Sequence, residues 1–142
     1  MRALSMMILW AAPVLAASPA ADDRATKDDY TLDASTTTTT LKKGGAGEFH
    51  LVITPKNGKK VHPDAPLEIS IVDNPHVKPG KQKLGRGDLV EKGAPAPHVR
   101  TSLQATKSGT TNLSVNVSFF LCTDAWCQRM NDRVEVPITV EE

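Results

Sequence analysis

The chain has 142 residues, enough for one well-buried domain and too few for two. Its 17 Lys and Arg residues nearly balance its 16 Asp and Glu residues, so no global field favours nucleic acid or an acidic substrate. Aromatic residues make up only 4% of the chain, and its threonines, valines and prolines favour short strands and turns over long helices.

Residues 1–20 have the features of a secretory signal peptide. Arg2 precedes an apolar run from Met6 to Ala17, and Val14-Leu15-Ala16 fits a small-residue cleavage site. The run is shorter than the roughly 20 residues that a membrane-spanning helix needs. We therefore expect cleavage and export to the periplasm or the exterior, with no membrane span left in the mature protein.

The next residues alternate between strand and turn patterns. Residues 21–29 are charged and have no periodicity, which predicts a flexible leader. From Tyr30 to Leu41 the run of threonines favours a first extended strand, since threonine is β-branched. Apolar residues alternate or cluster in further predicted strands at residues 49–53, 67–71, 88–90, 99–106, 111–121 and 134–140. With Gly- and Pro-rich turns between them, these about seven strands predict an antiparallel β-sandwich over residues 30–142.

The last two predicted strands carry the only cysteines of the chain. Two alternating runs in succession are most simply an antiparallel pair. Cys122 ends the first run, and Cys127 follows after four residues. Folding the strands together brings the two sulfurs face to face at the rim of a sheet. In an exported domain we expect such a pair to be oxidised at least part of the time.

The value of this disulfide to the fold is small, because so short a ring stabilises by only about 2 kcal/mol through loop entropy. That favours another use, although small exported domains also keep short-range disulfides to rigidify a loop. Arg129 and Arg133 favour a thiolate, whereas Asp124 opposes one. Trp126 serves as a docking surface, as a shield for a reactive sulfur, or as a cover for the end of the core.

The hairpin F-F-L-C-T-D-A-W-C, followed by V-E-V-P-I-T-V, resembles the N-terminal periplasmic domain of the bacterial thiol:disulfide interchange protein family. The segment G-K-K-V-H-P-D-A-P-L-E-I-S-I also resembles a connection in that family. The resemblance implies an immunoglobulin-like fold and a redox-active pair formed by Cys122 and Cys127. It places Asp124 and Trp126 around the pair. The charge of Arg129 makes it a further supporting residue on the reading of the sequence alone.

The sequence departs from the family pattern around the cysteines. It has one residue fewer between them, and Gln128-Arg129-Met130 stands where the family has prolines. The segment matching the family's cap loop, Pro79–Pro97, contains no aromatic residue. Electrons would come from a separate thioredoxin-like partner.

Other chemistries have little support in the sequence. His50, His62, His76 and His98, even together with the cysteines and Met130, lack the close, repeated spacing of metal-ligand motifs. No nucleophile motif, phosphate loop or paired-carboxylate signature is present. We therefore expect no metal and no cofactor.

Two functional hypotheses follow. The first is a periplasmic thiol–disulfide exchange relay, at most an oxidoreductase-like activity, that uses Cys122 and Cys127. The alternative is a non-catalytic interaction module that presents residues 55–66 and 79–97 to another envelope protein, with the disulfide as a brace.

Overall fold

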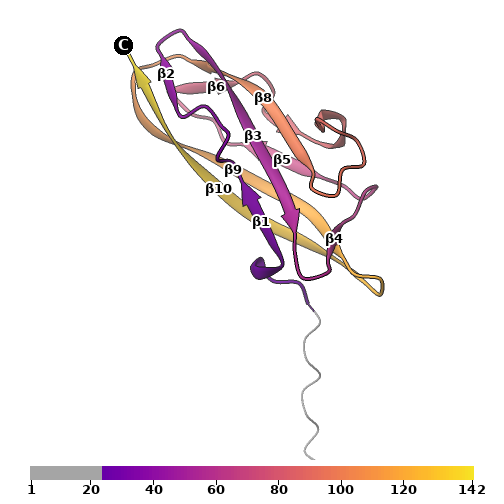
Figure 1. The fold of residues 1–142 in the computed structure, drawn as a ribbon. Coiled ribbons are helices and arrows are strands. Elements are labelled where there is room, and N and C mark those ends of the chain that lie inside the picture. The colour runs from indigo at the N-terminus through magenta and orange to yellow at the C-terminus, as the bar shows by residue number, and fades with distance from the viewer. Residues whose placement is uncertain (1–23) are drawn as a thin grey trace, which may run out of the picture.

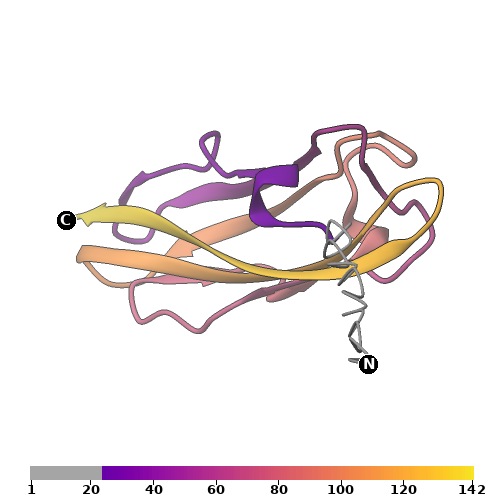
Figure 2. The same cartoon turned by 90° about the horizontal axis from the view of Figure 1, so that it is seen from below.

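The computed structural model describes residues 24–142, so the predicted signal peptide, residues 1–20, lies outside the described residues. The described chain forms two β-sheets packed face to face, shown from the side in Figure 1 and from below in Figure 2. The predicted all-β sandwich is confirmed. Within this part of the chain, no helix has the length and apolar character needed to cross a membrane.

One sheet has the strand order β1-β3-β8-β6, and the other has the order β2-β10-β9-β5-β7 with β4 also paired to β9. We call them the four-stranded and the six-stranded sheet. Their strands are β1 (Tyr30–Asp33), β2 (Thr40–Lys42), β3 (Ala46–Pro55), β4 (Lys60–Val61), β5 (Glu68–Ile71), β6 (Val77–Pro79), β7 (Lys83–Leu84), β8 (His98–Ala105), β9 (Gly109–Cys122) and β10 (Cys127–Glu141).

The strand order is that of an immunoglobulin-like sandwich. The four-stranded sheet matches the A-B-E-D order of such domains, and β5, β9 and β10 match C, F and G. The short β2 lies parallel to the end of β10, with Thr40 opposite Thr139. This parallel pair is the one departure, within residues 24–142, from the antiparallel pairing predicted for the sandwich.

The core lies between β3 and β9, whose alternate side chains face each other across the two sheets. On β9 the residues Leu113, Val115, Val117, Phe119 and Leu121 are all at most 2% exposed. The ring of Tyr30 packs edge-on against that of Phe119, with centroids 5.0 Å apart. Burying apolar side chains of this size stabilises the fold by about 1.5–3 kcal/mol each.

The predicted first strand over residues 30–41 divides between the two sheets. β1 pairs with β3 in the four-stranded sheet, whereas β2 pairs with β10. Between them, the Thr37 hydroxyl donates to the His50 carbonyl oxygen and accepts from the His50 N–H, both at 3.0 Å. The Thr37 side chain therefore forms the two hydrogen bonds that a paired strand would form with His50 of β3, at the point where the chain crosses to the other sheet.

The ten strands of residues 24–142 exceed the predicted number because of very short strands. β4, β6 and β7 span only two or three residues each and fall in segments predicted as connections. The strand predicted at residues 88–90 is replaced by a 3-10 turn, η2 (Arg86–Asp88), and a single bridge from Leu89 to Val99. Pairings this short leave no alternation to detect in a sequence.

Residues 24–29, predicted as part of a flexible leader, are anchored to the sandwich. The 3-10 turn η1 (Lys27–Asp29) is capped by Thr26. The Ala25 N–H donates to Gln128 Oε1 at 2.9 Å, and Gln128 Nε2 donates back to the Ala25 carbonyl oxygen at 3.3 Å. One β10 side chain therefore pairs with this segment as a neighbouring strand would.

Asp29 ties this segment to the turn after β3. Its carboxylate accepts hydrogen bonds from Asn57 Nδ2 at 3.0 Å and from the Thr26 N–H at 2.8 Å, and lies 3.2 Å from Lys59 Nζ. The Asn57 and Thr26 hydrogen bonds, with Lys59, lower the pKa of Asp29 to about 2 against the opposing effect of burial.

We predict that Asp29→Asn lowers the thermal midpoint at neutral pH and that this difference shrinks under acid conditions. The folded pKa, about 2, lies below the ordinary 3.8. The ionised group therefore stabilises the fold above the ordinary value, and this stabilisation is lost as the pH falls through the folded pKa. Thermal melts followed by circular dichroism at about pH 7, 4 and 2 measure the difference.

The matched control is Asp124→Asn, at an exposed position in the hairpin loop. We expect it to leave the midpoint unchanged at each pH. An Asp29→Asn difference that is the same at neutral pH and at pH 2 would contradict the prediction.

Candidate functional site at the cysteine hairpin

The cysteines lie opposite each other at the end of the longest strand pair. β9 ends at Cys122, β10 begins at Cys127, and the register sets these two residues against each other. They form a disulfide with an S–S distance of 2.03 Å. The predicted face-to-face arrangement is confirmed. Both residues belong to the six-stranded sheet, so the bond does not link the two sheets.

The backbone pairing explains why a disulfide fits here. The Thr123 N–H donates to the Trp126 carbonyl oxygen at 2.8 Å, so the adjacent cysteines occupy a non-hydrogen-bonded pair. Such positions bring the Cα atoms of facing strands closest, and those of Cys122 and Cys127 are 4.0 Å apart. The ladder therefore holds the sulfurs together before any bond forms.

The two cysteines differ in their access to solvent. Cys122 is 8% exposed, because β9 pairs with β4 on the side away from β10, with Lys60 opposite Cys122. Cys127 is exposed, since β2 pairs with β10 only at its far end, residues 139–141. Cys127 also lines an open hollow of about 430 Å³ together with Arg24, Trp126 and Gln128.

The four residues between the cysteines form a tight, hydrogen-bonded loop. Thr123 Oγ1 accepts from the N–H groups of Ala125 and Trp126 at 3.2 and 3.3 Å. Asp124 is exposed in this loop. The half-buried Trp126 packs against the core cluster, which fits its predicted role as a cover for the end of the core. It also lines the hollow around Cys127. Its roles as a docking surface or as a shield for a reactive sulfur stay predictions.

The arginines predicted to favour a thiolate are directed elsewhere. Arg129 Nε donates to Ser118 Oγ at 3.0 Å. Arg129 faces Phe120 on β9, and along β9 from Phe120, Ser118 and Cys122 lie in opposite directions. Arg133 lies 3.5 Å from Glu135 Oε1, farther along β10. Arg129 thus shares a strand with Cys127 without turning its guanidinium toward the disulfide.

A cavity of about 390 Å³ lies on the other side of the disulfide, against Cys122. Two loops form its walls, one between β3 and β5 and one between β7 and β8. Its lining consists of Pro55, Lys59, Lys60, Val61, His62, Pro63, Arg86, Leu89, Gly93, Ala94, Pro95, Pro97 and Cys122. We call it the Cys122 pocket. It lies where the two loops predicted to meet a partner come together.

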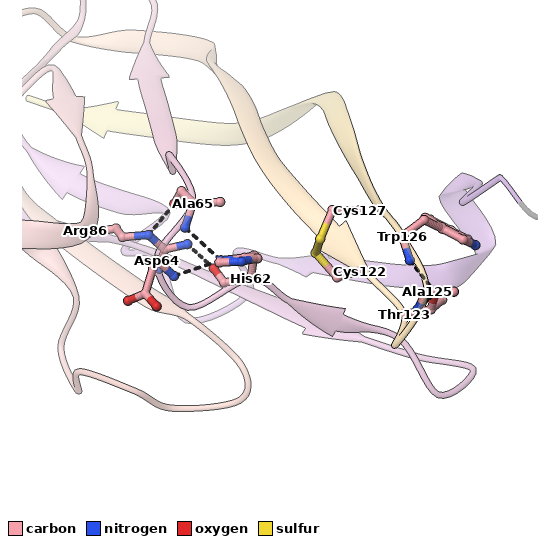
Figure 3. The surroundings of a disulfide bond; sticks show 9 residues. All are labelled: His62, Asp64, Ala65, Arg86, Cys122, Thr123, Ala125, Trp126 and Cys127. Atoms are coloured by element: carbon pink, nitrogen blue, oxygen red, sulfur yellow. Dashed lines mark hydrogen bonds between the residues drawn. A yellow bond between two sulfur atoms is a disulfide. The ribbon is translucent and has the colours of Figure 1, made fainter.

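Arg86 and His62 both line the Cys122 pocket. Figure 3 shows the hydrogen bonds that join Arg86, His62, Asp64 and Ala65. Arg86 Nε donates to the Ala65 carbonyl oxygen, and its Nη2 donates to that of His62. His62 Nδ1 accepts from the N–H groups of Asp64 and Ala65 at 3.0 and 2.9 Å. Since Nδ1 accepts two hydrogen bonds, the imidazole carries its proton on Nε2.

Sequence reasoning did not single out Arg86, Leu89 or Gln128 for the site. Arg86 is one of 17 basic residues and stands in no motif, and Leu89 lies in a segment with little periodicity. The sequence pointed only to the two regions, because Pro55–Pro66 and Pro79–Pro97 were both predicted to meet a partner. Where these two loops come together depends on how the chain passes between the two sheets, and no local sequence pattern encodes that path.

The four histidines do not come together. His50 Nδ1 on β3 lies 3.0 Å from Nε2 of His98 on β8, and His50 Nε2 lies 3.0 Å from Oε2 of Glu48 on its own strand. Burial, together with His50 and Arg100, lowers the pKa of His98. His62 lines the Cys122 pocket, and His76 Nδ1 lies 3.1 Å from the Lys107 carbonyl oxygen.

Met130, which the metal hypothesis grouped with the cysteines, is buried in the core. In residues 24–142, no group of three or more His, Cys, Asp or Glu side chains is placed to hold a metal ion.

Comparison with known proteins identifies no family for this chain. No protein-family model matches the chain, and no curated protein matches it. A solved structure with a similar fold contains domains 4 and 5 of the S-layer protein SbsC, with a TM-score of 0.44 and 10% sequence identity. The match covers 79% of this chain and 51% of that one, so the chain spans about half the length of the chain it matches.

We predict that Cys122→Ser plus Cys127→Ser leaves the sandwich folded and lowers the free energy of unfolding by no more than about 2 kcal/mol. The ring closed by the bond is short, with a sequence separation of 5, and the β9–β10 ladder already aligns its ends. Urea unfolding followed by circular dichroism measures the change. Wild-type protein under reductant should match the double variant, and an unfolded chain in either case would contradict the prediction.

Proposed function

We propose that the protein is an exported interaction module of the bacterial envelope that docks a partner protein at its cysteine-bearing end. The observation that carries this proposal is the Cys122 pocket, in which both loops and a buried cysteine meet. Its size lies within the range of binding pockets, about 300–1,000 Å³, and most of its lining is apolar. The predicted signal peptide supports export, and a disulfide is typical of proteins in oxidising compartments.

We predict that Ala94→Lys prevents capture of the partner from an envelope extract. Ala94 lines the pocket, and a lysine there occupies part of the space that a partner would fill. The matched control is Ala46→Lys, at an exposed position at the start of β3, whereas Pro55 at the end of β3 lines the pocket. Affinity capture with mass spectrometry compares the proteins recovered by each variant.

Wild type, Ala46→Lys and the double cysteine-to-serine variant should recover the same partner, because the disulfide acts as a brace in this function. Recovery of that partner by Ala94→Lys at the wild-type level would rule out docking at this end.

A second candidate function, thiol–disulfide exchange with a thioredoxin-like partner, has its own supporting observation. Cys127 is exposed in an open hollow while Cys122 is buried, so one sulfur is presented for attack. The resemblance of the hairpin to the thiol:disulfide interchange family supports the same candidate.

The exchange balances as two successive thiolate attacks. A partner thiolate attacks the Cys127 sulfur, forming a mixed disulfide and releasing Cys122 as a thiolate. The second cysteine of the partner, as a thiolate, then attacks the sulfur of the partner's first cysteine in the mixed disulfide. This attack releases Cys127 as a thiolate. The protein gains two electrons and two protons, and the partner leaves with a disulfide.

We predict that Cys122→Ser traps a mixed disulfide with a thioredoxin-like protein, whereas Cys127→Ser traps little. The remaining thiol is exposed in the first variant and buried in the second. The trapping partner is a thioredoxin-like protein whose single remaining cysteine is held as a mixed disulfide with thionitrobenzoate. The Cys127 thiolate attacks the partner's sulfur and releases thionitrobenzoate, and non-reducing electrophoresis measures the trapped complex.

The reduction potential of the wild-type pair, measured in a glutathione or dithiothreitol titration, should lie above about −300 mV. A potential well below that value would mark the bond as a structural disulfide. Equal trapping by both single variants would contradict attack at Cys127.

A further inference from the structure

The Cys122 pocket has rigid, apolar walls. Four of its lining residues are prolines, whose rings fix the backbone φ angle and keep the loops from rearranging freely. Val61 and Leu89 add aliphatic surface next to Cys122. A pocket of about 390 Å³ that is already formed binds an apolar side chain without a large ordering cost.

The polar part of the lining is entirely basic apart from His62. Arg86, Lys59 and Lys60 line the pocket, and no Asp or Glu does. Lys59 Nζ already pairs with Asp29, at 3.2 Å. Within residues 24–142, neither Arg86 nor Lys60 forms an ion pair. Arg86 donates two hydrogen bonds to backbone carbonyls, which leaves three of the five N–H groups of a guanidinium for a ligand.

The backbone beside the pocket favours a polypeptide as the occupant. The His62 N–H donates to the Phe120 carbonyl oxygen, so Lys60 and His62 form the hydrogen-bonded pairs of β4 with β9. The N–H and C=O of Val61, between them, therefore point away from β9. A segment that binds beside β4 in an extended conformation can form backbone hydrogen bonds with the N–H and C=O of Val61. Its alternate side chains then lie on one face.

We propose that the Cys122 pocket binds an extended segment of the partner protein in which an apolar side chain is flanked by an acidic residue. The apolar side chain fills the space between Val61 and Leu89, and the carboxylate pairs with Arg86 and Lys60. A carboxylate gains charge-assisted hydrogen bonds there that a neutral or basic residue cannot make. This inference rests on the proposed docking function and adds the chemistry of the partner.

The test uses a blocked pentapeptide with phenylalanine between two glutamates, titrated into ¹⁵N-labelled mature protein and followed by NMR. Shifts at the amides of Val61, Leu89 and Ala94 report occupancy of the pocket. We expect peptides with lysines in place of the glutamates, or glycine in place of phenylalanine, to bind at least about tenfold more weakly. Equal binding of the lysine peptide, or no shifts at these amides with the glutamate peptide, would overturn the proposal.

The variant that tests the charge is Lys60→Gln, because Arg86 also holds the backbone of residues 62–65. We expect an affinity loss of about threefold, as for a partly solvated ion pair. The matched control, Lys78→Gln on β6, lies outside the pocket and should bind as the wild type does. If Lys60→Gln bound the peptide with unchanged affinity, Lys60 would not be pairing with the peptide carboxylate, and the proposal would be contradicted.

Two further outcomes separate this inference from the function on which it rests. If capture of an envelope partner depends on Ala94 but the glutamate peptide does not bind, docking stands and the assigned partner chemistry fails. If 3-phenylpropionate binds as tightly as the peptide, the pocket belongs to a free small carboxylate and the peptide assignment is overturned.

Discussion

The antiparallel register of β9 and β10 is the constraint on which the rest of the structure depends. It runs from Gly109 opposite Val140 to Cys122 opposite Cys127, so one ladder sets both the core and the cysteine pair. A shift by one residue would turn the buried face of β9 to solvent and separate the sulfurs. The packing of Phe119 and its neighbours between the sheets excludes that shift. The site is thus as well defined as the core.

The two cysteines differ in their surroundings because β4 covers the edge of β9 at Cys122, whereas β2 covers β10 only far from Cys127. Near Cys127, the backbone of Ala25 is joined to β10 through hydrogen bonds with the Gln128 side chain. The pocket and the open hollow therefore lie on opposite sides of one bond. The buried cysteine lines the pocket between the loops, and the exposed cysteine lines the hollow beside β10.

Sequence reasoning identified the long strands and the facing cysteines because both depend on local alternation. Phe49, Leu51 and Ile53 on β3, and the run that ends at Leu121, have a period of two that only a half-buried strand explains. It did not identify the division of residues 30–41 between sheets, because the turn relies on a Thr37 hydroxyl that one threonine among five supplies. Nor did it single out Arg86, whose place in the pocket depends on carbonyls more than twenty residues away.

The short ring closed by the disulfide also changes what a break in the backbone does. A protease that cuts at the exposed Asp124 or Ala125 opens the loop, but the bond between Cys122 and Cys127 still joins the two pieces. The β9–β10 ladder of fourteen facing pairs, of which the two cysteines are one, remains in place. A nicked molecule therefore gains the mass of one water, keeps its sandwich, and separates into two chains only when it is both reduced and unfolded.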